Sequence, residues 1–152
     1  MLKSFEHVGF TVSNLDRALS FYRDLLGLEV EWERVYEEEY VRQAVGYPDL
    51  KLRCAFLKLP GTETRLELLE YQNVRRQEVD LHRANPGNAH LCLAVKDLSR
   101  LYERLKASGV DFVSAPVVST AGHYRGTKIV YLHDPDGISL QLMELYKKGD
   151  VE

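Results

Sequence analysis

The sequence predicts an α+β fold: two βαβββ modules in tandem that form a curved mixed sheet, an open cup, with helices packed on its outer face. Two observations predict it. A strand-like segment followed by a helical segment occurs twice, with His7 and His90 placed 83 positions apart. Each half then ends in two strand-like segments around a turn, with Leu66 and Leu140 placed 74 positions apart. The chain is therefore a strand, a helix and three strands, carried out twice.

The first strand and helix have clear local signals. Residues 7–12 alternate in polarity and contain β-branched and aromatic residues, as a strand requires. Ser13 or Asn14 can cap the helix that follows, and Gly27 ends it. Apolar residues at helical spacing lie between these ends: Leu15, Ala18, Leu19, Tyr22, Leu25 and Leu26.

The rest of the first half carries an insert and a hairpin. Residues 33–49 are more than a hairpin needs, and we expect a short helix there that ends before Gly46. A Pro60–Gly61 turn then separates two strands.

The second half follows the same order. Residues 90–95 are strand-like, Asp97 can cap the next helix, and Gly109 ends it. A turn with the sequence DPDG separates the last two strands. We expect a single domain over residues 1–152, with module 1 at about 3–71, a connector at 72–88 and module 2 at about 89–146. The connector is charged, and we expect a surface crossover with one irregular helical turn.

Charge, hydropathy and cysteine content indicate which kinds of partner and location to expect. The net charge is −3 and the pI is near 6.0, which predicts neither nucleic acid nor an anionic membrane as partner. No apolar run approaches the roughly 20 residues of a bilayer span, and Glu6 and His7 interrupt any signal-peptide core. Cys54 and Cys92 lack CxxC spacing, so we expect free thiols and a cytoplasmic location.

Glu67 lies among leucines in the segment TRLELLEY, where an ionised carboxylate needs a partner or a metal. Alternation places Leu66 and Leu68 on the opposite face of the strand. Three other strands also have one polar residue opposite a purely apolar face. The four polar residues are His7, Glu67, His90 and Gln141. Imidazole and oxygen donors suit a divalent ion of the Ni, Co, Zn, Mn or Fe group, so we expect these four to converge on a metal.

At these residues the sequence resembles the vicinal oxygen chelate superfamily, which includes glyoxalase I, methylmalonyl-CoA epimerase, extradiol dioxygenases and bleomycin resistance proteins. The resemblance rests on HVGFTVSNLDRALSFYRDLLGL, LELLEY, GNAHLCLAV and YLHDPDGISLQLME. It implies a metal cup with ligands at His7, Glu67, His90 and Gln141, and pairing into homodimers, in which two subunits complete the cup in some members. Glyoxalase I and the epimerase usually have glutamate at the fourth position, whereas Gln141 can coordinate a metal but cannot accept a proton at neutral pH.

The resemblance implies a small oxygen-chelating substrate, and three function classes stay open. In the leading one, a lyase or isomerase acting next to a carbonyl, Glu67 both binds the metal and takes the proton. In the second, a non-haem Fe(II) dioxygenase, His7, His90 and Glu67 supply the metal ligands and Tyr131 resembles a tyrosine of ring-cleaving enzymes. In the third, the cup binds a ligand without catalysis.

Further residues could act in the site, and each also has an interpretation without a role in function. His123 and Arg125 lie in a glycine-flanked loop and could carry a proton and clamp an anion, or could be solvated loop residues. Arg65 could bind a substrate anion, or pair with a nearby glutamate. Tyr131 and Cys92 could equally be packing residues of their strands.

Overall fold

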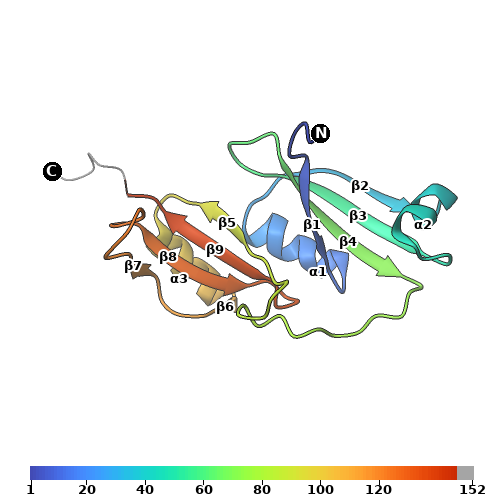
Figure 1. Ribbon diagram of the computed structural model, residues 1–152. Coiled ribbons are helices and arrows are strands. Elements are labelled where there is room, and N and C mark those ends of the chain that lie inside the picture. The colour runs from blue at the N-terminus through green and yellow to red at the C-terminus, as the bar shows by residue number, and fades with distance from the viewer. Residues whose placement is uncertain (147–152) are drawn as a thin grey trace. The chain divides into compact units, whose positions relative to one another are not determined.

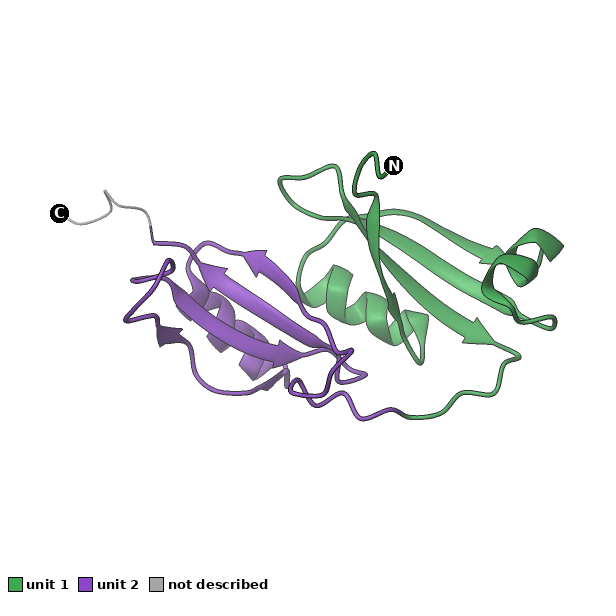
Figure 2. Ribbon diagram, viewed as in Figure 1, with its two compact units in different colours: residues 1–78 green, residues 79–152 purple. Residues whose placement is uncertain are grey.

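The computed structural model describes residues 1–146 and contains two compact units, residues 1–78 and residues 79–152 (Figures 1 and 2). The boundary falls inside the predicted connector. Each unit has its own mixed sheet with a helix against one face, so the predicted α+β class with two open modules is confirmed. That the two units work as a single domain, and that their sheets form one cup, stay predictions.

The first unit contains four strands in the order β1-β4-β3-β2, with β1 parallel to β4 and the other pairs antiparallel. Its elements are β1 (His7–Thr11), α1 (Leu15–Leu19), the π-helical η1 (Ser20–Leu25), β2 (Val30–Tyr36), α2 (Glu39–Val45), β3 (Lys51–Lys58) and β4 (Arg65–Gln72). The predicted short helix in the insert is α2, and Gly46 ends it with a φ of 79°.

The first long helix departs from prediction in its second half. The Asn14 side chain caps it by accepting a hydrogen bond from the Arg17 amide at 2.8 Å. From Ser20 the helix widens into a π-turn, in which the Leu26 amide donates to the Phe21 carbonyl at 2.9 Å. This wider turn includes Phe21 and Tyr22, which are adjacent in sequence and both buried. Apolar spacing predicts a helix here but does not distinguish α from π.

The second unit contains β5 (Leu91–Ala94), α3 (Leu98–Ala107), β6 (Asp111–Phe112), β7 (Val117–Val118), β8 (Lys128–His133) and β9 (Ser139–Glu144). Its sheet runs β5-β9-β8-β6, and β7 also pairs with β8. The expected second strand of the module is therefore two short pieces. Pro116 lies between them and has no amide hydrogen to donate, which accounts for the break.

Each core lies between a sheet face and its helix. In β4, Leu66 and Leu68 are fully buried, and in β9, Leu140 and Leu142 are buried in the same way. These are the apolar faces that alternation predicts opposite Glu67 and Gln141.

A buried glutamate joins helix to sheet in the first unit. The Glu70 carboxylate accepts a hydrogen bond from the Leu15 amide at the start of α1, at 2.9 Å. Arg53 on the neighbouring strand lies 3.3 Å from the same carboxylate and also pairs with Asp16. Glu70 therefore has a structural role, because it satisfies a helix end and is charge-paired.

The second unit repeats this arrangement. Glu144 accepts a hydrogen bond from the Leu98 amide at the start of α3, at 2.8 Å, and Lys128 lies 3.2 Å from it. The 74-residue spacing between Glu70 and Glu144 thus reflects a shared helix-capping contact.

The connector contains no helix over residues 72–88, so the expected irregular helical turn is wrong. The chain makes two turns instead, closed by hydrogen bonds from the Asn85 amide to the His82 carbonyl and from the Asn88 amide to the Asn85 carbonyl. Asn88 also donates from its side chain to the His82 carbonyl at 2.8 Å. Side chains that bond to the local backbone compete with helical hydrogen bonds. Within residues 1–146, no helix combines the length and the apolar character that crossing a bilayer requires.

Candidate functional site

His7 and Glu67 lie together on the face of the first sheet away from α1. His7 begins β1, and Glu67 is central in β4, the strand that pairs with β1. The Nε2 atom of His7 is 3.2 Å from Oε2 of Glu67. Burial alternates along both strands, which turns these polar side chains to one face and the aliphatic ones to the other. The sequence prediction that they share a face is confirmed.

Glu6 contacts the ring of His7 on the side away from Glu67. Its carboxylate contacts Nδ1 of the His7 ring, and it also lies 3.5 Å from Arg65. A histidine that binds a metal through one nitrogen commonly donates its other N–H to a carboxylate, which orients the ring. Glu6 and Glu67 therefore hold opposite sides of the imidazole. A nitrogen and a carboxylate oxygen that converge in this way fit half of a divalent metal site.

The Glu67 carboxylate has weak protein partners. Its Oε1 accepts a hydrogen bond from the buried Cys54 thiol at 3.3 Å, and its Oε2 faces His7. Burial and the Glu67 charge raise the pKa of Cys54 well above its usual range, so this thiol stays protonated. A Cβ atom at Gly9 would lie 3.3 Å from Oε2, so glycine leaves the carboxylate room. No lysine or arginine among residues 1–146 pairs with Glu67, in contrast to Glu70.

The second unit brings together three of the predicted residues. Tyr131 and Gln141 are partners across β8 and β9, and Gln141 is also the partner of Cys92 on β5. The His90 ring lies edge-on to the Tyr131 ring, with centroids 5.3 Å apart. Cys92 is exposed, so its interpretation as a buried apolar residue is wrong. It shares its face with the polar residues of β9 and has little packing over it.

The four predicted ligands thus fall two in each unit. Among residues 1–146, no group of three or more His, Cys, Asp and Glu side chains lies close enough to hold a metal. His7 and Glu67 form one pair, and in the other unit His90 contacts Tyr131, the cross-strand partner of Gln141. Their convergence on a single ion stays a prediction.

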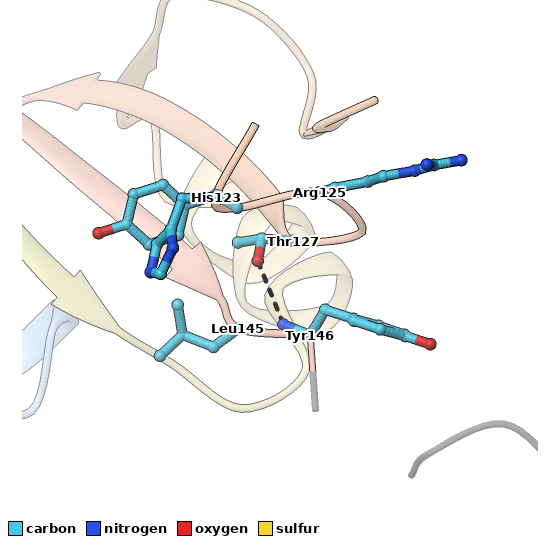
Figure 3. A pocket seen from close by; sticks show the side chains of 6 residues that line it. His123, Arg125, Thr127, Leu145 and Tyr146 are labelled. Atoms are coloured by element: carbon cyan, nitrogen blue, oxygen red, sulfur yellow. Dashed lines mark hydrogen bonds between the residues drawn. The ribbon is translucent and has the colours of Figure 1, made fainter. Parts of the chain in front are cut away.

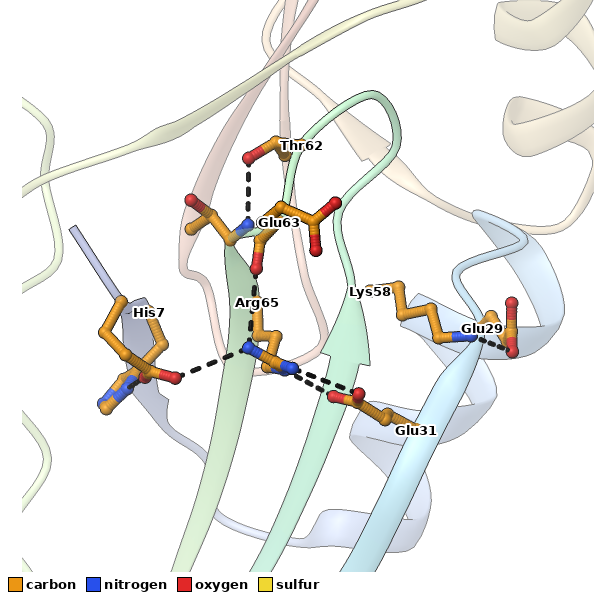
Figure 4. Close-up of polar contacts among 9 residues, drawn as sticks. His7, Glu29, Glu31, Lys58, Thr62, Glu63 and Arg65 are labelled. Atoms are coloured by element: carbon orange, nitrogen blue, oxygen red, sulfur yellow. Dashed lines mark hydrogen bonds and ion pairs between the residues drawn. The ribbon is translucent and has the colours of Figure 1, made fainter. Parts of the chain in front are cut away.

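Arg65 takes part in an ion-pair network on the same face as His7 (Figure 4). Its guanidinium binds Glu31 through two nitrogens, one of them 3.2 Å from Oε1, and it also reaches Glu6. These contacts correspond to the glutamate-pairing interpretation of Arg65. Its role as an anchor for a substrate anion stays a prediction.

The loop of residues 119–127 lines an open pocket of about 430 Å³ together with the end of the described chain (Figure 3). The lining residues are His123, Tyr124, Arg125, Thr127, Leu145 and Tyr146. In Figure 3 the Arg125 side chain points away from His123. Within residues 1–146, the ring of His90 contacts Tyr131 and the ring of His123 contacts Tyr124, and neither contact joins His123 or Arg125 to His90. Their catalytic and binding roles stay predictions.

Sequence reasoning did not find the contacts of Glu6, Cys54 and Phe56. The Phe56 ring is edge-on to His7 at 5.3 Å, and it is the cross-strand partner of Glu67. Cys54 and Phe56 are two positions apart on β3, and this spacing indicates that both lie on one face of the strand. Which face they share depends on the pairing of β3 with β4, and only the register supplies it.

The insert helix α2 lies over the same face. Its Val41 packs with Leu50 and Leu52, joined by the partly buried Leu69 and Tyr71. Leu69 and Tyr71 alternate with Glu67 along β4 and so share its face. Figure 1 shows α2 at one end of this sheet. The insert therefore covers part of the face that carries His7 and Glu67.

A sequence model of the Glyoxalase/Bleomycin resistance protein/Dioxygenase superfamily matches residues 4–142. The chain belongs to this superfamily. The predicted resemblance to vicinal oxygen chelate proteins is thereby confirmed. A glyoxalase family protein from Bacillus cereus has the same fold, with a TM-score of 0.84 and 22% identity over 97% of each chain.

Relatives of known name within this superfamily include an epimerase and several lyases. A 2-epi-5-epi-valiolone epimerase from an Actinomyces species is 31% identical over 91% of this chain and 78% of its own length. Lactoylglutathione lyase of Haemophilus influenzae is 29% identical over 91% of this chain and 90% of its own. Lactoylglutathione lyase of Arabidopsis thaliana is 26% identical over 93% of this chain, which spans 44% of that longer relative.

Proposed function

We propose that this protein is a divalent-metal-dependent isomerase or lyase that moves a proton at a carbon next to a carbonyl. The observation that carries the proposal is the His7–Glu67 pair, in which a carboxylate that pairs with no lysine or arginine among residues 1–146 lies 3.2 Å from an oriented imidazole. The naming of relatives as an epimerase and as lyases supports the same class of chemistry.

In this proposal His7, Glu67, His90 and Gln141 hold the ion. A bound Ni, Co, Zn, Mn or Fe ion supplies Lewis acidity, which stabilises negative charge on a substrate oxygen. Glu6 keeps the His7 ring oriented, with Nε2 turned toward Glu67. Gln141 contributes an amide oxygen and cannot serve as base.

Glu67 is the proposed general base. Its carboxylate takes the proton from the carbon beside the carbonyl, and the electron pair of the broken C–H bond forms the enolate. The protonated Glu67 then returns a proton to the other face of the same carbon. Where that carbon carries a hydroxyl, the proton can return instead to the former carbonyl carbon, while the hydroxyl proton moves to the former carbonyl oxygen and the hydroxyl oxygen becomes the new carbonyl. No oxidant or reductant enters, and the product is an isomer or epimer of the substrate.

Because the ligands fall two in each unit, the proposal requires a first-unit pair and a second-unit pair to meet. We also propose that the protein forms a homodimer. The two ligand pairs of one site then come either from the same chain or from the two subunits. The cytoplasmic location stays a prediction from the sequence.

Deuterium exchange tests the proposed function. The protein is purified without chelator, its metal is measured, and candidate carbonyl compounds are followed by NMR in D₂O. We expect exchange at the carbon beside the carbonyl that stops when a chelator removes the ion or when Glu67 is changed to Gln. Wild-type protein that binds none of the five metals would refute the proposal and leave a ligand-binding cup as the better interpretation.

One observation favours the dioxygenase as second candidate. Tyr131 lies against His90 and across the strand pair from Gln141, so a tyrosine hydroxyl is near the second-unit ligands. Oxygen uptake with catechol on protein loaded with Fe(II), abolished by Tyr131→Phe, would select this reaction.

A further inference from the structure

A row of aromatic rings crosses the first sheet beside the proposed metal ligands. Trp32 on β2 stacks on Phe56 of β3, with centroids 4.3 Å apart and planes 22° apart. The rings of Phe56 and His7 form a T-shaped pair, with centroids 5.3 Å apart. Phe56 is buried, whereas Trp32 is 38% exposed. We call these two rings the aromatic shelf.

The shelf lies on the same face as Glu67, because Phe56 is the cross-strand partner of Glu67 and Trp32 is the partner of Phe56. Further along the same strands, Tyr36 and Tyr71 pack with α2. A ligand bound at His7 and Glu67 therefore has the flat shelf beside it and the α2 cluster at the end of the face.

The positive charges on this face are already paired. Arg65 binds Glu31 and Glu6, and Lys58 binds Glu29 (Figure 4). Arg34 of β2 is a further cation on this face. It pairs with Glu38, and its guanidinium lies over the Tyr36 ring.

Carboxylates therefore outnumber cations around the shelf. In the contacts described above, all within residues 1–146, five carboxylates (Glu6, Glu29, Glu31, Glu38 and Glu67) accompany three cations (Arg34, Lys58 and Arg65). A bound divalent ion would bring this half-site to about neutrality. It would leave no surplus positive charge to attract an anion.

We infer that the substrate is an uncharged hydroxycarbonyl compound whose ring or chain lies flat on Trp32. The inference rests on the proposed function, since the metal and Glu67 act on the carbonyl end. The flat face of the Trp32 indole packs well against the C–H bonds of an uncharged ring or chain. A carboxylate on the substrate could bind a cation of this face only by displacing one of the existing ion pairs. Trp32 is thus a specificity-determining residue, and carboxylate-bearing glutathione adducts are poor ligands for this half-site.

The single tryptophan of the chain makes the test direct. Metal-loaded protein is titrated with 2-hydroxycyclohexanone, which is uncharged, and with S-hexylglutathione, which carries carboxylates. We expect the first probe to change Trp32 fluorescence saturably and the second to leave it unchanged. Exchange in D₂O is then compared for 2-hydroxycyclohexanone and for the hemithioacetal of methylglyoxal and glutathione.

Matched variants separate stacking from folding. Trp32→Ala should raise KM for 2-hydroxycyclohexanone about tenfold and leave kcat within about twofold, and Trp32→Phe should restore most of the loss. Val35→Ala is the control, because Val35 is also exposed on β2 but on the opposite face. Its KM should equal that of the wild type.

The outcomes distinguish the two proposals. Exchange of the hemithioacetal with higher kcat/KM than 2-hydroxycyclohexanone, or a KM that Trp32→Ala leaves unchanged, would overturn the uncharged substrate while keeping the proposed function. Exchange of neither compound with any of the five metals would overturn both.

Discussion

Glu67 and Glu70 lie three residues apart on β4, and their replacement by glutamine should have opposite consequences. Glu70 is buried and accepts hydrogen bonds from the Leu15 amide at 2.9 Å and from Gln72 at 2.8 Å, with Arg53 at 3.3 Å. Glu67 contacts a thiol and an imidazole instead. The first carboxylate stabilises the fold, and the second is proposed to serve the site.

The magnitudes follow from these contacts. A hydrogen bond to a charged group contributes about 1.5–3 kcal/mol, and loss of a helix cap costs about 0.5–2 kcal/mol. Since glutamine keeps one acceptor oxygen, Glu70→Gln should lower the free energy of unfolding by about 2 kcal/mol, or roughly 4–8 °C in Tm. Glu67→Gln should change the stability of metal-free protein by less than about 0.5 kcal/mol.

The metal measurement should give the reverse order. Loss of a supporting residue beside a metal ligand costs about 10–100-fold in affinity, and loss of a ligand should cost no less. Glu67→Gln should therefore weaken metal binding by at least about 10–100-fold, whereas Glu70→Gln should retain it.

Urea unfolding of metal-free protein and metal titration by calorimetry would check both variants. Equal destabilisation by the two substitutions would show that Glu67 is a structural carboxylate, and the assignment of their roles would be wrong.

Four further results are expected. His7→Ala should abolish metal binding with an unchanged circular dichroism spectrum, and Glu6→Ala should weaken the affinity about tenfold or more, measured by the same titration; unfolding of His7→Ala would instead identify a core histidine. Folding raises the pKa of the Cys54 thiol above its value of about 9.0 in the unfolded chain. The contribution of Cys54 to the free energy of unfolding should therefore be constant below pH 9.0 and should fall above it by at most about 1.4 kcal/mol per pH unit. Cys54→Ala should reduce this alkaline slope in urea midpoints between pH 8 and 10.5, and an identical slope would refute the cause. Gly126→Ala should lower Tm, since Gly126 has a φ of 88° and a Cβ there would lie 2.8 Å from Cγ of Tyr146; an unchanged Tm would show that the loop adjusts freely.

Local sequence patterns determined the repeat, the faces and the helix ends of this protein. Strand alternation has a period of two, so the polar face with Glu67 could be separated from the face with Leu66 and Leu68 without coordinates. Asn14 and Asp97 cap their helices, as predicted, because each side chain accepts a hydrogen bond from a backbone amide in the first turn. Such features depend on residues within a few positions of one another, and the sequence contains that information directly.

Tertiary structure decided which partner each polar residue has. The sequence could not show that Glu70 caps a helix 55 residues away. Nor could it show that Cys54 donates to Glu67, or that Trp32 and Phe56 form a shelf beside His7. These contacts depend on strand register and on how the insert folds back over the sheet. A shift of one residue in register would turn every side chain of a strand to the other face, so only the paired strands specify the site.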